Sequence, residues 1–176
     1  MRKLNYCIES SLDGFIARPD HAYDFLPAGG PHQDRFLEHM AEYDVNLMGL
    51  KTYEIGVEAG ILRADENLKH YVVSSSLEKT IDPAIEILRD DAMAVIRRLK
   101  AEPGKNILLT GGSLLASSLL AAGLIDEIRL RILPVLIGTG IPLFANLQKD
   151  VVLRLVESEV YSNGVALNVY RPVHPG

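Results

Sequence analysis

The sequence lacks the features that mark disulfide-rich proteins and membrane proteins. Its one cysteine, Cys7, cannot form a disulfide within the chain, so nothing requires an oxidising compartment. No stretch of about 18 apolar residues is present, which excludes a membrane-spanning helix. The first ten residues, MRKLNYCIES, lack the long apolar run of a signal peptide. We therefore expect a cytoplasmic protein that does not act at a membrane.

Excess positive charge and metal-binding patterns are missing as well. The net charge is −5 and the isoelectric point is near 5.5, whereas nucleic-acid-binding proteins usually present a basic face. None of the 5 histidines is spaced with cysteines or acids as metal ligands are, so we expect no metal site. The 176 residues are 48% hydrophobic and 23% charged, which predicts a single globular domain, residues 1–176, with a substantial core.

Strand and helix patterns alternate along the chain without a linker. Apolar or alternating runs predict strands at 3–10, 15–17, 45–48, 71–73, 84–88, 107–109 and 127–132. Helical periodicity predicts helices from Asp34, from about Lys51, over 92–99 with Asp90 or Asp91 as the cap, and over 113–123. We expect a long loop over residues 18–33.

The C-terminal part predicts a hairpin, because 151–161 and 165–171 flank the turn sequence Ser162-Asn163-Gly164. Strands separated by helices pair in parallel, whereas a hairpin is antiparallel. The sequence therefore predicts an α/β fold, with a mixed, mostly parallel central sheet, helices on both faces and a C-terminal antiparallel hairpin.

The segment from Asn106 to Gly123, NILLTGGSLLASSLLAAG, is the most informative part of the chain. A short apolar strand breaks at Gly111-Gly112, and a helix begins at Ser113. Adjacent glycines let a ligand approach bare backbone, and the N-terminus of a helix favours an anion. The segment is thus typical of a cradle for a nucleotide diphosphate, although an ordinary tight turn has the same glycines.

Four motifs give the chain a resemblance to a known family. They are SLDGFIA at 11–17, MGLKTYE at 48–54, VVSSS at 72–76 and TGGSLLASSLLAAGLIDEIRLRILPVLIGTGIPLF at 110–144. In this order they resemble the dihydrofolate-reductase-fold superfamily, in the branch of the riboflavin-biosynthesis reductase (RibD C-terminal domain-like). The ending YSNGVALNVYRP is similar to small stand-alone members of that branch. The resemblance covers about residues 2–172 and implies the dihydrofolate-reductase-like three-layer fold.

The resemblance implies an oxidoreductase that transfers hydride from NADPH or NADH to a small heterocyclic or imine substrate. It places the coenzyme diphosphate against two turns, one before each of two helices. It places the adenosine ribose beside the serines after the 71–73 strand, and the nicotinamide beside the 11–17 hairpin. The implied coenzyme-binding residues are Ile16, Gly49, Leu50, Lys51, Thr52, Ser74, Ser75, Thr110, Gly111, Gly112, Ser113 and Leu114.

Two departures from the family pattern leave the choice of coenzyme open. Family members that use NADPH usually carry arginine where this chain has Leu50, and many carry another where Ser75 stands. Arginine suits a phosphate because its planar fork can donate two parallel hydrogen bonds. Only Lys51 and the serine hydroxyls remain for the extra phosphate. Family precedent favours NADPH, and NADH stays as the alternative.

The substrate side departs from both parent activities. Dihydrofolate reductases carry a carboxylate on the helix before the MG motif, at a position that falls on Gln33, with Asp34 next to it. Riboflavin reductases commonly carry glutamate where this chain has Thr110. We therefore expect a third or broadened substrate of pyrimidine or pteridine type, with Asp13, Thr110 and Asp34 as the candidate catalytic groups. Asp13 has an alternative role, which is to shape its Asp-Gly turn.

Two further hypotheses concern the activity and the assembly. The missing substrate signatures also suit a non-catalytic nucleotide- or ligand-binding protein of the same fold. The stand-alone relatives are commonly dimers, and residues 123–134 with the C-terminal strands offer an apolar edge for a homodimer. The small-molecule substrate and a second copy of the chain are thus the expected partners.

Overall fold

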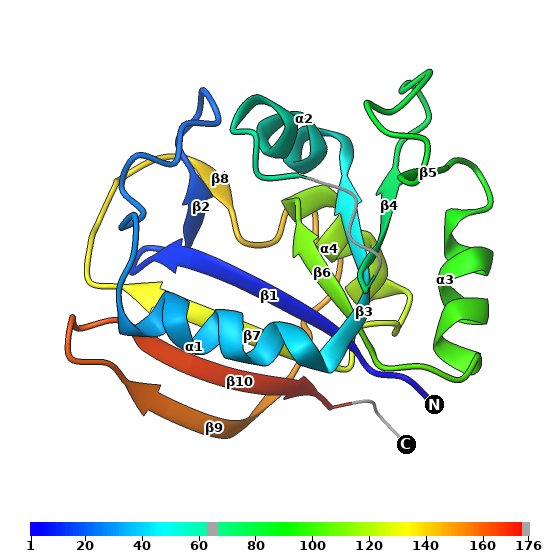
Figure 1. Ribbon diagram of the computed structural model, residues 1–176. Coiled ribbons are helices and arrows are strands. Elements are labelled where there is room, and N and C mark those ends of the chain that lie inside the picture. The colour runs from blue at the N-terminus through cyan, green and yellow to red at the C-terminus, as the bar shows by residue number, and fades with distance from the viewer. Residues whose placement is uncertain (63–66, 174–176) are drawn as a thin grey trace.

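The computed structural model, which describes residues 1–62 and 67–173, is built around one eight-stranded sheet (Figure 1). Its strands are β1 (Leu4–Ser11), β3 (Tyr43–Gly49), β4 (Lys69–Val73), β5 (Glu86–Leu88), β6 (Asn106–Gly111), β7 (Glu127–Leu133), β9 (Leu153–Val160) and β10 (Ala166–Pro172). They lie in the order β5-β4-β3-β6-β1-β7-β10-β9. The strands from β5 to β7 pair in parallel, and β10 is antiparallel to β7 and β9. The expected mixed sheet and C-terminal hairpin are confirmed.

Helices cover both faces of the sheet, as the sequence predicted. They are α1 (Pro31–His39), α2 (Leu50–Glu58), α3 (Ala92–Ala101) and α4 (Ser113–Ala121), and the short helix η1 (Met40–Glu42) follows α1. Apolar residues of α3 and α4 pack on one face in the main core, with Tyr6 and Leu109 of the sheet. α1 packs on the other face against Cys7 and Leu108, and α2 packs against Met48. No helix among residues 1–62 and 67–173 is long and apolar enough to cross a membrane.

Three local features differ from the sequence expectations, namely the bounds of two elements and one additional small sheet. The helix expected from Asp34 begins at Pro31, because proline suits the first helical position, where no backbone donor is needed. The strand expected at 84–88 is shortened to β5, since Ile85 donates to Asp82 in a turn. A two-stranded sheet, β2 (Phe15–Ala17) with β8 (Ile141–Pro142), was not expected. It fixes the hairpin beside the carboxyl end of β1.

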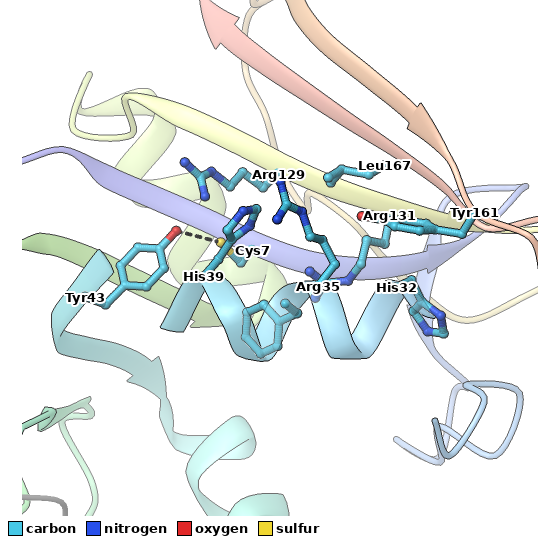
Figure 2. Close-up of a pocket in the computed structure, with 10 residues that line it drawn as sticks. Cys7, His32, Arg35, His39, Tyr43, Arg129, Arg131, Tyr161 and Leu167 are labelled. Atoms are coloured by element: carbon cyan, nitrogen blue, oxygen red, sulfur yellow. Dashed lines mark hydrogen bonds between the residues drawn. The ribbon is translucent and has the colours of Figure 1, made fainter. Parts of the chain in front are cut away.

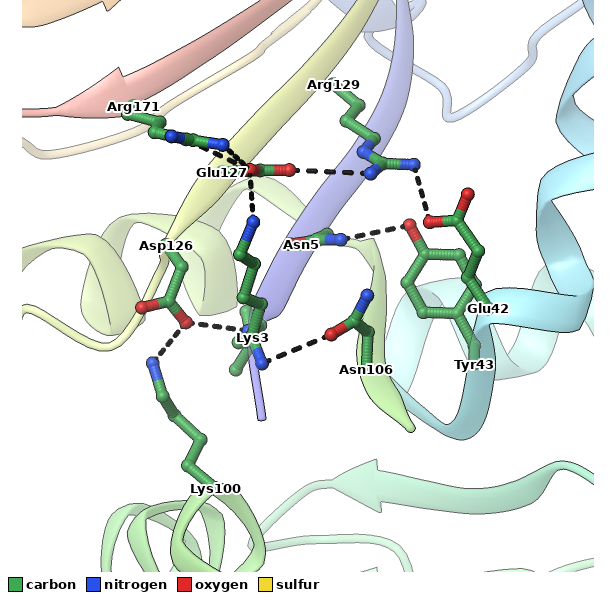
Figure 3. Close-up of polar contacts among 11 residues, drawn as sticks. Lys3, Asn5, Glu42, Tyr43, Lys100, Asn106, Asp126, Glu127, Arg129 and Arg171 are labelled. Carbon is green, nitrogen blue, oxygen red and sulfur yellow. Dashed lines mark hydrogen bonds and ion pairs between the residues drawn. The ribbon is translucent and has the colours of Figure 1, made fainter. Parts of the chain in front are cut away.

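The polar face of β7 is buried under α1 and the neighbouring loops. Alternation of charged and apolar residues in a strand usually indicates that one face meets solvent, but Glu127 is only 3% exposed. Figure 3 shows its carboxylate surrounded by cations: Lys3 lies 3.0 Å away, Arg171 2.8 Å and Arg129 3.4 Å. Burial opposes the charged form, yet these hydrogen bonds and charges hold the pKa of Glu127 below its usual value. Alternating charges thus mark an ion-pair layer inside the protein.

Candidate functional site

The direction of the chain connections reverses between the neighbouring strands β3 and β6. The chain leaves β3 through α2 and moves outward to β4, while it leaves β6 through α4 and moves across β1 to β7. The two helices lie on opposite faces of the sheet. In open α/β sheets, ligands bind outside the carboxyl ends of strands at such a reversal of direction. The strand order alone therefore indicates a ligand site at the carboxyl ends of β3 and β6.

The turns before α2 and α4 touch each other at this point. Gly49 ends β3 and precedes α2, and Gly112 precedes α4. A β-carbon added to Gly49 would lie only 3.4 Å from the backbone nitrogen of Gly112. Gly111 has a φ of +129°, which L-residues rarely adopt, and the Gly111–Gly112 peptide is cis. Two helix N-termini and bare backbone therefore converge, as an anionic bridge requires.

The other coenzyme candidates at these two turns lie in different surroundings. The hydroxyl of Thr52 is 3.2 Å from the position of a β-carbon on Gly111, so it lies over the glycine turn. Leu50 packs in the cluster around Met48, whereas Lys51 is exposed and pairs with Glu54 at 3.2 Å. At the start of α4, Leu114 is 64% exposed and Ser113 is buried. Among the described residues, the Ser113 hydroxyl has no hydrogen-bond partner.

The loop after β4 lies beside the end of β5. The buried Ser74 hydroxyl accepts hydrogen bonds from the backbone N–H groups of Ser76 at 3.2 Å and Leu77 at 3.0 Å. Ser75 is exposed, and its carbonyl accepts a hydrogen bond from Arg89 at 3.3 Å. The Arg89 guanidinium also donates to the Leu77 carbonyl at 2.8 Å. Arg89 was missed by the sequence reasoning, because only the pairing of β5 with β4 brings it to this loop.

The hydroxyl of Thr110 is directed at β3. It donates to the Asn46 side-chain oxygen at 3.1 Å, and Asn46 in turn contacts the His70 ring at 3.2 Å. These side chains lie on the sheet face that carries α1 and α2, just below the glycine turn. Hydrogen bonds between these polar side chains were not predicted, since Asn46 interrupts an apolar run and His70 lies just before the expected strand at 71–73.

The carboxylate of Asp13 is bound to a backbone turn on the other side of the site. It accepts hydrogen bonds from the backbone nitrogens of Gly138 at 2.8 Å and Ile137 at 3.3 Å. A hydrogen bond from Ser11, together with these N–H groups, lowers the pKa of Asp13. Asp13 is therefore ionised at neutral pH and fixes the loop before β8, while Ile16 lies in β2 beside it.

Asp34 lies in the first turn of α1 and is exposed. Neither a hydrogen bond nor an ion pair joins any two of Asp13, Thr110 and Asp34 in the part of the chain that the structure describes. The three candidate catalytic groups thus do not form one cluster. In contrast, the candidates at the two glycine turns are brought together.

A small cavity lies between α1 and the sheet, on the face away from the main core (Figure 2). Arg131 crosses it, donating to Glu9 at 2.9 Å and lying over the Phe36 ring at 4.5 Å. His32 is fully buried beside them, and one of its ring nitrogens contacts Asn163 at 2.9 Å. Burial raises the pKa of the Cys7 thiol in the same cavity. These contacts attach α1 to β1, β7 and the hairpin turn, and Cys7 is a buried core residue.

Comparisons with known proteins show the family and the fold of the chain. The chain is 30% identical over 171 residues to the uncharacterized protein YwjB of Bacillus subtilis (strain 168), covering 97% of this chain and 98% of the relative. Its fold is similar to a putative riboflavin biosynthesis protein from Shewanella sp. PV-4, with a TM-score of 0.82, 24% identity and coverage of 99% and 100%.

A dihydrofolate reductase from Enterococcus faecalis, solved in complex with NADP(H) and RAB-propyl, shares the fold at a TM-score of 0.66. The identity is 15%, and the match covers 97% of this chain and 96% of that one. The sequence also matches the family described as the RibD C-terminal domain over residues 2–167. The predicted dihydrofolate-reductase-like fold is confirmed, and the chain belongs to the RibD C-terminal domain family.

Proposed function

We propose that the protein is an NAD(P)H-dependent reductase of a small heterocyclic substrate. The best candidates are 5-amino-6-(5-phosphoribosylamino)uracil and related pyrimidines or pteridines. The observation that carries the proposal is the contact between the α2 and α4 turns at Gly49 and Gly112. Membership of the RibD C-terminal domain family supports a reductase-type fold.

The two turns fit the diphosphate of a dinucleotide. Each helix N-terminus contributes about 0.3–1 kcal/mol toward a nearby negative charge, in addition to the hydrogen bonds from its free N–H groups. Gly112 leaves a space that a β-carbon would fill, 3.6 Å from the Thr52 hydroxyl. The protein would bind the coenzyme through Gly49, Thr52, Gly111 and Gly112. When bound, the coenzyme supplies the hydride, and the protein orients the reactants and excludes water.

Solvent is the proton source in this proposal. Asp13 is unsuited to donate a proton at neutral pH, because hydrogen bonds from Ser11, Gly138 and Ile137 stabilise its ionised form. The Thr110 hydroxyl donates to Asn46, so it organises the floor below the glycine turn. Asp34 faces solvent on α1 and can reach a substrate only if that substrate extends over the helix.

The alternative is a non-catalytic binding protein with the same crevice, and the separation of the three catalytic candidates favours it. The test is fluorescence titration with NADPH and NADH, followed by coenzyme oxidation with pteridine, ribosylaminopyrimidine and imine substrates. We expect binding and substrate-dependent oxidation. Binding without oxidation of any substrate would support the alternative, and no binding of either coenzyme would contradict the reductase.

We further propose that the protein is a homodimer that buries one face of β9. This strand ends the sheet, and all of its residues are exposed. Its pairing with β10 shifts by one residue at Val156, because Glu157 faces Val169 while Leu155 faces Tyr170. The bulge reverses the alternation of side chains, so it places Leu155 and Val160 on the same face.

The residues 123–134 include β7, which lies inside the sheet, so β9 rather than β7 provides the apolar edge. Leu155 is 52% exposed and Val160 73%. A groove beside them is lined by the apolar Leu120, Phe144, Leu147, Val151 and Leu153 and by the polar Gln148, Lys149 and Asp150. Exposed apolar side chains that are bordered by polar residues are typical of a protein interface.

Light scattering tests this assembly. We expect a particle of twice 19.4 kDa for the natural protein, and a single-chain particle for Leu155→Glu, because the new charge would be buried. Glu157→Gln on the opposite face of β9 is the matched control and should remain dimeric. A 19.4-kDa particle for the natural protein at micromolar concentration would contradict the proposal.

A further inference from the structure

Arg89 is a cation held in a fixed position at the outer end of the proposed coenzyme crevice. It follows the last residue of β5, and two of its N–H groups donate to the carbonyls of Ser75 and Leu77. Among residues 1–62 and 67–173, it forms no ion pair with a carboxylate within 4.0 Å. Its side chain is exposed, so its remaining N–H groups face solvent.

The position of Arg89 separates it from the diphosphate site. β5 is the second strand from β3, and strands lie about 4.8 Å apart, so the end of β5 is about 10 Å from the Gly49 turn. The loop after β4 lies between them and carries the hydroxyls of Ser74 and Ser75. Lys51, the only cation that the sequence offered here, pairs with Glu54. Arg89 is therefore the cation available to pair with an anion at the outer end of the proposed crevice.

We propose that Arg89 binds the 2′-phosphate of NADPH and gives the protein its preference for NADPH over NADH. The inference rests on the proposed function and on the position that the family resemblance implies for the adenosine ribose, beside Ser74 and Ser75. Arg89 reaches the ribose from the next strand and replaces the arginines missing at Leu50 and Ser75. The two carbonyl contacts hold the guanidinium in place, so little side-chain freedom is lost when a phosphate binds.

The test compares the dissociation constants of NADPH and NADH for the natural protein and for Arg89→Gln. We expect the natural protein to bind NADPH at least about tenfold more tightly, since a charge-assisted hydrogen bond to phosphate accounts for about 10-fold to 100-fold in affinity. Arg89→Gln should weaken NADPH binding by at least about tenfold and change the dissociation constant of NADH by less than about twofold. Arg97→Gln, on the exposed side of α3, is the matched control with the same change of charge.

A second pair of probes isolates the phosphate itself. Adenosine 2′-monophosphate should compete for the site of the natural protein more strongly than adenosine 5′-monophosphate does, and Arg89→Gln should remove the difference. If Arg89→Gln weakens NADPH and NADH equally, Arg89 acts only by holding the loop and the inference is wrong. A natural protein that prefers NADH also contradicts it, while the proposed reductase stands. If neither coenzyme binds, the proposed function fails first.

Discussion

Replacing Gly112 by alanine is expected to weaken coenzyme binding by about 100-fold while the protein keeps its fold. The φ of Gly112 is −95°, which any residue adopts, and a β-carbon there would lie 3.6 Å from the nearest neighbour, the Thr52 hydroxyl. The methyl group therefore fits the protein but occupies the space above the turn. It would push the diphosphate away from the N–H groups of α4, and each charged hydrogen bond lost costs about 1.5–3 kcal/mol. Calorimetric titration with NADPH measures the effect.

Two other glycine variants show whether the loss at Gly112 arises in the crevice. Gly29→Ala meets no atom within 4 Å, so it should change neither binding nor the thermal midpoint. Gly111→Ala should destabilise the fold by about 1–3 kcal/mol, because a φ of +129° is strained for alanine. A Gly112→Ala protein with an unchanged melting temperature and unchanged NADPH affinity would place the coenzyme elsewhere.

The largest effect on stability is expected from Asp126→Ala. Lys100 is only 5% exposed, and its ammonium group contacts the Leu124 carbonyl at 2.6 Å and the Asp126 carboxylate (Figure 3). Asp126 also accepts a hydrogen bond from the backbone of Leu4 at 2.7 Å. Removing the carboxylate leaves a buried charge and a buried N–H with too few partners. The free energy of unfolding should fall by about 3–5 kcal/mol, measured by urea denaturation.

A double variant separates the charge effect from lost packing. Lys100→Met combined with Asp126→Ala removes the uncompensated charge and keeps most of the side-chain volume, so it should be more stable than Asp126→Ala alone. The exposed Glu58→Ala is the control, with an expected change within about 0.5 kcal/mol. If Asp126→Ala behaved like Glu58→Ala, the Lys100–Asp126 pair would not contribute to stability.

The sequence predicted the parts of the fold that depend on local patterns. Apolar runs followed by helical periodicity located the strands and the helices that follow them, as in the segment from Asn106 to Gly123. The sequence also predicted that the glycines at 49, 111 and 112 lie at turns between a strand and a helix, because few other residues suit such a turn. The start of α1 was missed, since apolar spacing pointed to Asp34 whereas proline at position 31 begins the helix.

Features that depend on pairing between distant segments could not be predicted. Arg89 contacts the carbonyl of a residue 14 positions away, and nothing in its own neighbourhood indicates a phosphate ligand. The alternating charges of β7 give the same sequence pattern whether that face of the strand is exposed to water or covered by a charged helix. Only the position of α1 shows that Arg131 and Glu9 are an interior pair. Likewise, the bulge at Val156 decides which apolar side chains of β9 share a face.

The proposed reductase requires that the amides of two turns, at Gly49–Thr52 and Gly111–Leu114, together bind the diphosphate bridge of a dinucleotide. Backbone NMR during titration of the natural protein with NADPH tests this claim most directly. We expect saturable shifts of both sets of amides with a single binding constant, and shifts of the amides in the Ser74–Leu77 loop that follow the same curve. Shifts confined to another surface, or no shifts at millimolar coenzyme, would contradict it.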